Sequence, residues 1–118
     1  MKRYDLGKNA EQFGQKQFWV VRCGRYHVWV SYNTAVAIVD NQTHEVILGK
    51  LARGFSRTTS KQVTQACYTF ARGYDIINYN SVRYWEFTNT HKLNDEKWGV
   101  EWDKCDYAMR CVYEVEHF

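Results

Sequence analysis

The feature that most constrains this chain is one helical segment that interrupts a series of strand-like segments. Within residues 59–72, four apolar residues repeat at the spacing of one helix face: Val63, Ala66, Cys67 and Phe70. Thr59 and Gln62 have the spacing of a capping box, which predicts that the helix begins at Thr59. Gly73 can adopt the left-handed conformation that ends a helix, directly after Arg72. The segment therefore predicts one principal helix whose apolar face packs on the rest of the chain.

The segments before this helix have the composition of β-strands. They are rich in β-branched and aromatic residues, are separated by turn-forming residues, and comprise 18–23, 26–32, 34–39 and 44–49. Because short connections join them, they predict an antiparallel meander. The segment 34–39 is apolar on both faces, which predicts a central strand that is covered on both sides. The predicted fold class is α+β, an antiparallel sheet with about four strands in the meander plus C-terminal strands, packed against one main helix at residues 59–72.

The two ends of the chain and the region after the helix complete the predicted fold. Residues 1–16 are polar and irregular and predict a frayed segment. After the helix, residues 74–80 predict a connection and residues 82–88 a further strand. Two more strands fit residues 98–115, although residues 105–112 also fit a short helix. All 118 residues are predicted to form a single small globular domain.

No pattern in the sequence indicates catalysis. The chain has no glycine-rich phosphate-binding motif, no H-E-x-x-H and no pair of C-x-x-C units. Cys23 and His27 are the only local combination of a thiol and a base, and we interpret them as a packed thiol beside a strand histidine. We therefore predict no catalytic residue, no metal site and no cofactor, and we expect a protein that is not an enzyme.

Composition sets the expected compartment and the charge of a partner. No apolar run approaches the ~20 residues that span a membrane, and the first residues lack a secretory signal, so we expect a cytoplasmic protein with reduced cysteines. Residues 1–83 carry 12 Lys and Arg against 5 Asp and Glu, whereas residues 84–118 carry 4 against 8. This asymmetry fits attraction between the two parts of the chain, ordinary solvated faces on both parts, or an acidic partner for the basic part.

A cluster of cations at the predicted helix start is the strongest indication of a binding site. Four cations fall within twelve residues that include no acidic side chain: Lys50, Arg53, Arg57 and Lys61. A helix dipole disfavours cations at its start, so a phosphate or a partner's carboxylate would explain them. Alternatively, the nearby hydroxyls only cap the helix and the cations only solubilise the loop. Five Trp, nine Tyr and six Phe exceed the obvious need of a small core and offer anchors for an interface. The candidate binding residues are Arg53, Arg57, Thr58, Ser60, Lys61, Trp85, Trp98 and Trp102.

Two segments resemble recurring pieces of a known family. The sequence SYNTAVAIVD at residues 31–40 and the sequence FSRTTSKQ at residues 55–62 resemble a family of small phage and prophage domains of unknown function. In that family a Tyr-x-Thr strand precedes an aromatic-Ser-x-Thr-Thr-Ser-Lys/Arg turn that starts a helix. The resemblance, over residues 28–70, implies a small accessory protein made in the cytoplasm of an infected bacterium, and it assigns no catalytic residue.

These observations lead to two expectations for function. The first is a non-catalytic, phage-type accessory protein that acts by binding and inhibits a host defence protein or a nucleic-acid-handling protein. The second is a nucleic-acid-binding module that uses the cations for phosphates and exposed Trp or Tyr rings for bases. We expect the partner to be a host macromolecule, a protein rather than a nucleic acid, and not a membrane. The identity of the partner and the existence of a homodimer are left open by the sequence.

Overall fold

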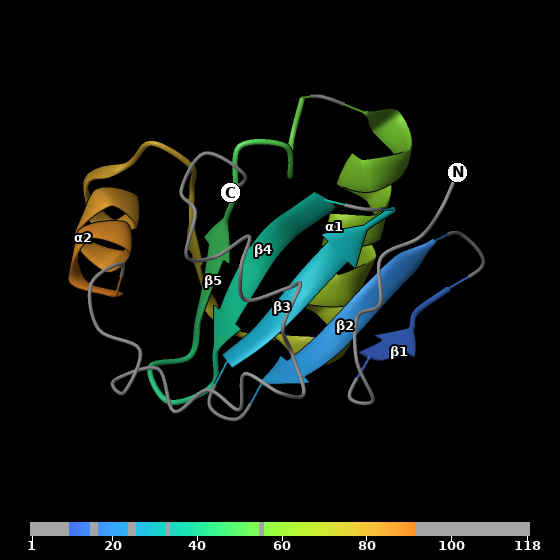
Figure 1. Cartoon of the computed structure of the whole chain (residues 1–118), viewed down its shortest axis with the longest axis horizontal. Coiled ribbons are helices and arrows are strands. Elements are labelled where there is room, and N and C mark those ends of the chain that lie inside the picture. The colour runs from blue at the N-terminus through green and yellow to red at the C-terminus, as the bar shows by residue number, and fades with distance from the viewer. Residues whose placement is uncertain (1–9, 15–16, 24–25, 33, 55, 92–118) are drawn as a thin grey trace.

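The computed structural model describes residues 10–14, 17–23, 26–32, 34–54 and 56–91. Within these ranges the chain forms six strands and two helices (Figure 1). Their order and bounds are β1 Ala10–Gln12, β2 Phe18–Cys23, β3 Tyr26–Ser31, β4 Thr34–Asp40, β5 Glu45–Leu48, α1 Arg57–Phe70, β6 Asp75–Ile77 and α2 Val82–His91. A mostly antiparallel sheet with one main helix makes this an α+β fold, as the sequence predicts.

The described strands form one sheet whose spatial order follows chain order, from β1 at one edge to β6 at the other. Neighbouring strands from β1 to β5 are antiparallel, which confirms the predicted meander. β6 is parallel to β5, and α1 makes the crossover between them. β1 forms within residues 1–16, which the sequence predicts as a frayed segment. β6 forms within residues 74–80, which the sequence predicts as a connection. Strands of three residues depend on the neighbour they pair with rather than on a pattern of their own.

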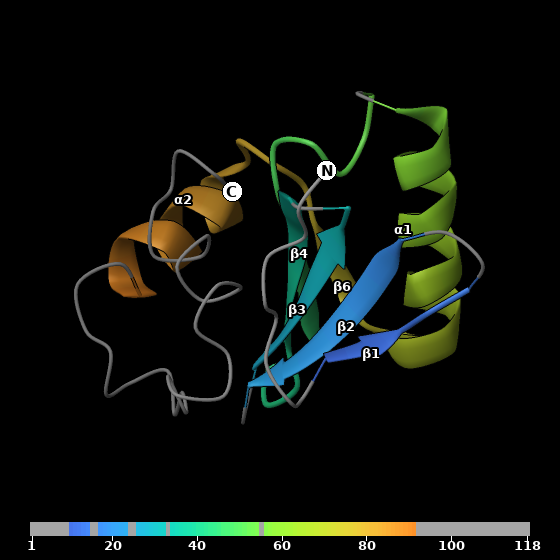
Figure 2. The same cartoon turned by 45° about the vertical axis from the view of Figure 1, so that its right-hand side comes forward.

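A helix covers each face of the sheet, α1 on one side and α2 on the other (Figure 2). Under α1, Val63 and Ala66 belong to a core cluster that includes Trp29 from β3. Under α2, Tyr84 and Phe87 belong to a second cluster built on the opposite face of the strands. β4 lies between these clusters and is buried from position 35 to position 40. This burial confirms the predicted central strand that is covered on both sides.

A bulge in β4 determines which of its side chains point towards α1. Trp29 on β3 pairs with Ala37 on β4. The next residue, Val30, pairs with Ala35, which leaves Val36 as an extra residue in the ladder. As a result, Val36 and Ala37 both pack in the core under α1, whereas Ala35 packs in the core under α2. Ala37 thus faces α1 and Ala35 faces α2, and each of these small side chains leaves room for the helix above it.

Helix α1 begins before the predicted Thr59, and a different residue caps it. Ser56 has an extended backbone, with φ −140° and ψ 135°, and its Oγ accepts a hydrogen bond from the Thr59 backbone N–H at 3.3 Å. The predicted start is wrong because Ser56 has the same spacing to Thr59 that Thr59 has to Gln62. The earlier cap leaves the buried Thr59 and Gln62 side chains free to bond with the sheet. Gly73, with φ 83°, has the predicted left-handed conformation, but α1 ends at Phe70 and not at the predicted Arg72.

Helix α2 occupies residues 82–88, which the sequence predicts as a strand. Ser81 caps the helix, because its Oγ accepts a hydrogen bond from the Tyr84 backbone N–H at 3.2 Å. Tyr84 and Phe87, three residues apart, are both buried against the sheet, whereas Val82 is 78% exposed. The helical spacing of two large rings, together with the serine cap, therefore outweighs the strand preference of the aromatic residues.

Three further predictions concern the C-terminal strands, the burial of Phe70 and the absence of a membrane span. The strands expected within 98–115, and the choice between strand and helix at 105–112, lie outside the described residues. Phe70, which the sequence places on the apolar face of α1, is only partly buried and packs edge-on against Phe13, with ring centroids 5.0 Å apart. Within the described ranges, neither helix is long and apolar enough to cross a membrane.

Candidate functional site

Four of the predicted binding residues line one hollow on the outer surface of α1. This basic hollow has a volume of about 410 Å³ and is lined by Arg53, Arg57, Ser60, Lys61, Thr64 and Gln65. Arg57 and Lys61 lie four residues apart and therefore on one side of the helix, while Arg53 comes from the loop before α1. All three cations are exposed. The fold thus brings together cations that the sequence selects, and it adds two polar residues that continue the same helix face.

Arg53 is held in place by α1. Its Nη1 donates to the Ser60 carbonyl oxygen and to Thr64 Oγ1, each at 2.7 Å. Thr64 Oγ1 in turn donates to the Ser60 carbonyl oxygen at 3.0 Å. Among the described residues, these contacts use only one nitrogen of the guanidinium group, so its other N–H groups remain available to an anion. The long side chain is already ordered before a partner arrives, which lowers the entropic cost of binding.

The cations of the basic hollow differ from the paired cations elsewhere in the described structure. Arg22 pairs with Glu11 at 2.7 Å and Arg83 with Glu45 at 2.7 Å. No described carboxylate pairs with Arg53, Arg57 or Lys61. The first turn of α1 also contains no acidic residue, and the helix dipole adds positive potential there. The basic hollow therefore concentrates positive potential at a place suited to a phosphate or a carboxylate.

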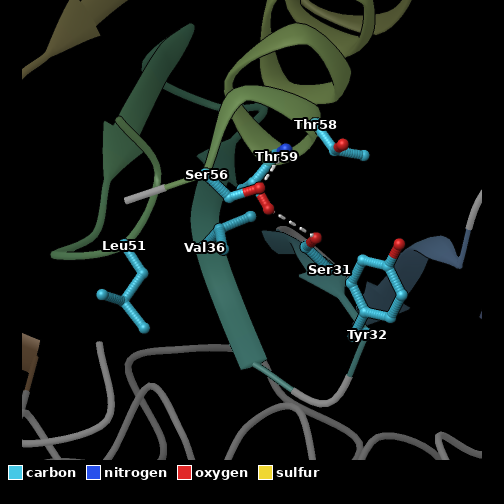
Figure 3. A pocket seen from close by; sticks show the side chains of 7 residues that line it. All are labelled: Ser31, Tyr32, Val36, Leu51, Ser56, Thr58 and Thr59. Carbon is cyan, nitrogen blue, oxygen red and sulfur yellow. Dashed lines mark hydrogen bonds between the residues drawn. The ribbon is translucent and has the colours of Figure 1, made fainter. Parts of the chain in front are cut away.

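A second pocket, rich in hydroxyl groups, lies between the first turn of α1 and the sheet (Figure 3). This hydroxyl pocket has a volume of about 410 Å³ and is lined by Ser31, Tyr32, Val36, Leu51, Ser56, Thr58 and Thr59. Thr58, a predicted binding residue, therefore faces this pocket and is not part of the basic hollow. Tyr32 is 40% exposed and has φ 56°, a left-handed backbone that is uncommon for an aromatic residue.

Buried hydrogen bonds connect α1 to β3 beside the hydroxyl pocket. Ser31 Oγ donates to Gln62 Oε1 at 3.0 Å. The Ser31 and Thr59 hydroxyl oxygens are also 3.0 Å apart (Figure 3). Because the Ser31 hydroxyl has a single proton, the Thr59 hydroxyl is the donor in the second bond. The sequence predicts a capping role for Gln62 but no binding role for Ser31, Tyr32 or Gln62. Ser31 and Thr59 are 28 positions apart, so only the docking of α1 on β3 reveals this link.

Two titratable side chains outside these pockets, His27 and Cys67, are partly buried, and burial shifts their pKa values. Burial, together with the charge of Arg22, lowers the pKa of His27 and favours its neutral ring. Burial raises the pKa of the Cys67 thiol and favours its unreactive protonated form. The side chain of Cys23, the predicted neighbour of His27, lies outside the described residues. Within the described part of the chain, no three His, Cys, Asp or Glu side chains gather as metal ligands.

Trp85 lies apart from the basic hollow. It belongs to α2, on the opposite side of the sheet from α1 (Figure 2). Its side chain is 41% exposed, and its Nε1 donates to Asn80 Oδ1 at 2.7 Å. Trp98 and Trp102, the other two predicted anchors, lie outside the described residues. The cations and Trp85 therefore occupy separate surfaces.

Comparison with known protein families gives a match over the N-terminal two-thirds of the chain. Residues 1–77 match a family that is described as "Family of unknown function (DUF8033)". No curated protein and no solved structure matches the chain. The matched range contains the sheet from β1 to β6, helix α1 and both pockets, whereas α2 follows it. Because the match covers more than half of the chain, the protein belongs to this family of unknown function.

Proposed function

We propose that this protein is a non-catalytic accessory protein that acts by binding, and that the basic hollow contacts an acidic surface of a host macromolecule. The observation that carries the proposal is the gathering of Arg53, Arg57 and Lys61 around one hollow without a carboxylate partner among the described residues. Arg57 occupies the first residue of α1, where each cation opposes the helix dipole by about 0.3–1 kcal/mol. A role in binding an anion gives a reason for this unfavourable placement.

The resemblance of residues 31–40 and 55–62 to small phage and prophage domains supports a role during infection. In that setting the accessory protein inhibits a host defence protein or a nucleic-acid-handling protein by covering part of its surface. Burial raises the pKa of the described Cys67 thiol and so disfavours the thiolate that a cysteine nucleophile needs, which supports binding rather than turnover. This part of the proposal depends on the resemblance, whereas the binding role depends on the basic hollow.

Direct binding of nucleic acid is the second candidate function. A separate observation favours it: no acidic residue occurs between Lys50 and Tyr74, and the exposed ring of Tyr68 lies on the same helix as Arg57 and Lys61. The cations would contact phosphates and the ring would stack on a base. Both candidates use the same cations, so one pair of substitutions tests them together.

The test compares partner capture by three forms of the purified protein. The first is the wild type and the second is Arg57→Gln/Lys61→Gln, which keeps Arg53 because that side chain also holds the loop on α1. The third is Asn78→Glu/Val82→Glu, which lowers the net charge equally at exposed positions near α2. Each form is incubated with bacterial lysate, with and without nuclease.

The proposal predicts that the wild type and the control variant retain the same partner and that Arg57→Gln/Lys61→Gln loses it. A partner that survives nuclease treatment is a protein, and one that disappears is held through nucleic acid. If Arg57→Gln/Lys61→Gln keeps its native fold and retains every partner of the wild type, the basic hollow is not the binding site.

A further inference from the structure

The outer surface of α1 carries more than the basic hollow. Beyond Lys61, exposed polar residues continue along the helix to Tyr68, which is 66% exposed. Arg72 follows the helix, and its guanidinium carbon lies 4.7 Å from the centroid of the Tyr68 ring. This strip, which we call the α1 outer face, consists of Arg53, Arg57, Lys61, Thr64, Gln65, Tyr68 and Arg72.

The α1 outer face has charge of one sign along its whole length. Its charged members are all Arg or Lys, and the nearest acidic residue after it in the sequence is Asp75. At a rise of 1.5 Å per residue, Arg57 and Tyr68 lie about 17 Å apart along the helix axis. Positive charge over this distance complements an extended polyanion better than a single carboxylate or phosphate.

The composition of this face favours nucleic acid over an acidic protein. Protein interfaces have an apolar core inside a polar rim, and Tyr68 is the one large apolar side chain of the α1 outer face. Interfaces with nucleic acid are more polar and much more positively charged. Arginine, lysine and hydroxyl side chains are also the usual contacts to phosphate oxygens.

The exposed Tyr68 ring favours single strands over duplexes. Unpaired bases stack on aromatic side chains, whereas the bases of a duplex are already stacked on one another. Arg72 places its guanidinium over one face of the same ring, which leaves the other face for a base. We infer that the α1 outer face binds single-stranded nucleic acid, with the sugar–phosphate backbone along Arg53, Arg57 and Lys61 and one base on Tyr68. This inference rests on the second candidate function, because it names single-stranded nucleic acid as the partner of the same surface.

The first test measures the affinity for a fluorescein-labelled oligothymidine of about 12 nucleotides, which forms no duplex, by fluorescence anisotropy at several salt concentrations. Three cations along the backbone predict a slope of about −2.1 for the logarithm of the binding constant against the logarithm of the salt concentration. Arg57→Gln/Lys61→Gln leaves Arg53 alone, so it should reduce the magnitude of the slope to about 0.7 and weaken binding by about 10- to 30-fold at 0.1 M salt. Asn78→Glu/Val82→Glu has the same net charge as Arg57→Gln/Lys61→Gln, but it should bind like the wild type.

The second test separates stacking from charge. Tyr68→Ala should weaken binding of the oligothymidine by about fivefold or more with little change in the salt slope. Tyr68→Phe keeps the ring and should restore the wild-type affinity. A duplex of equal length should bind more weakly than the single strand, because it offers no free base to the ring.

Three results would overturn the inference: no binding of the oligothymidine, equal binding by Arg57→Gln/Lys61→Gln, or a duplex that binds as tightly as the single strand. If the oligothymidine does not bind but a nuclease-resistant partner is still lost in Arg57→Gln/Lys61→Gln, the partner is an acidic protein. The nucleic-acid inference then fails and the proposed binding function stands. If binding of the oligothymidine and capture of the lysate partner are both independent of Arg57 and Lys61, the nucleic-acid inference and the proposed binding function both fail.

Discussion

Helices α1 and α2 cover opposite faces of one sheet, and their cations have opposite surroundings. In α2, Arg83 donates from Nε to Glu45 Oε2 at 2.9 Å and from Nη2 to Glu45 Oε1 at 2.7 Å. In α1, Arg57 and Lys61 face solvent and pair with no described carboxylate. The comparison separates two uses of a cation. Arg83 attaches a helix to the sheet through a buried carboxylate, whereas no carboxylate of the described ranges occupies the cations of α1.

The two helices also differ in what holds them on the sheet. α2 contributes two large buried rings, Tyr84 and Phe87. α1 contributes the smaller Val63 and Ala66, and its Thr59 and Gln62 side chains form hydrogen bonds with Ser31, Thr59 as the donor and Gln62 as the acceptor. Deleting a side chain should therefore cost more stability under α2 than at the polar link under α1. Substitutions on the outside of α1 should change binding with little loss of stability.

The largest expected effect is the loss of a ring under α2. Phe87→Ala should lower the free energy of unfolding by about 3–5 kcal/mol, because the ring is fully buried and leaves a cavity. Urea denaturation measures the change, and Val82→Ala in the same helix should alter it by less than about 0.5 kcal/mol. Phe70→Ala should cost less than Phe87→Ala, because the Phe70 ring is only partly buried. A cost below about 1 kcal/mol for Phe87→Ala would show that α2 is not firmly docked.

The ion pair that attaches α2 should have the next largest effect. Glu45→Gln should lower the free energy of unfolding at pH 7 by about 1–2 kcal/mol. The expected loss is smaller than for a fully buried ion pair, because Arg83 is partly exposed and water screens its charge. The hydrogen bond from Arg83 is the main cause that lowers the pKa of Glu45 in the folded protein. This contribution is present above the ordinary glutamate pKa of about 4.3 and is lost as the pH falls through the lower folded value.

Urea denaturation at pH 7 and pH 3 tests this linkage. The wild type should lose more stability than Glu45→Gln between the two pH values, because the variant has no carboxylate to protonate at this position. Equal losses in the two proteins would mean that the Arg83–Glu45 contact adds nothing to the stability of the fold.

The polar link under α1 should have a smaller effect. Ser31→Ala removes the partner of both Thr59 and Gln62 and should cost about 1–2 kcal/mol in urea denaturation. Ser60→Ala on the same helix is the matched control, since only the Ser60 backbone carbonyl receives the described bonds from Arg53 and Thr64. Similar stabilities for the two variants would show that the buried hydrogen bonds do not hold α1 in place.

The smallest expected effect has the opposite sign. Arg57→Glu places an acidic residue in the first turn of α1, which lacks one, and should raise the free energy of unfolding by about 0.3–1 kcal/mol. The same change should abolish binding of the partner. Urea denaturation and anisotropy on one protein sample measure both quantities. A variant that is less stable than the wild type would remove the argument that Arg57 is placed there at the expense of stability.

The sequence predicts the elements whose own pattern is strong. β2 to β5 and the body of α1 follow from periodicity, and the cations at the helix start follow from their contrast with the dipole. α2 escapes prediction because Val82, Tyr84 and Trp85 are strand formers, and the helical spacing of Tyr84 and Phe87 matters only once a sheet face is there to cover. The cap at Ser56 was missed because Thr59 offers an equally good local pattern.

The polar parts of the candidate site depend on contacts between distant segments. The link from Ser31 to Thr59 exists only because α1 lies on β3, and the bulge at Val36 sets which side chains face it. Thr64 was missed because its role, to receive a hydrogen bond from Arg53, depends on how the preceding loop returns to the helix. The sequence therefore identifies the charged side chains, but the fold determines their neighbours.

The parallel position of β6 bears on the order in which the chain folds. Strands β1 to β5 pair with sequence neighbours and close only short loops, so that part of the sheet can assemble while later residues are still being synthesised. β6 reaches β5 only after α1 has formed the crossover, and Arg83 of α2 also bonds to Glu45 at the start of β5. The late elements therefore depend on β5 and α1. In hydrogen exchange, amides of β6 and α2 should open together and earlier than those of β2, β3 and β4.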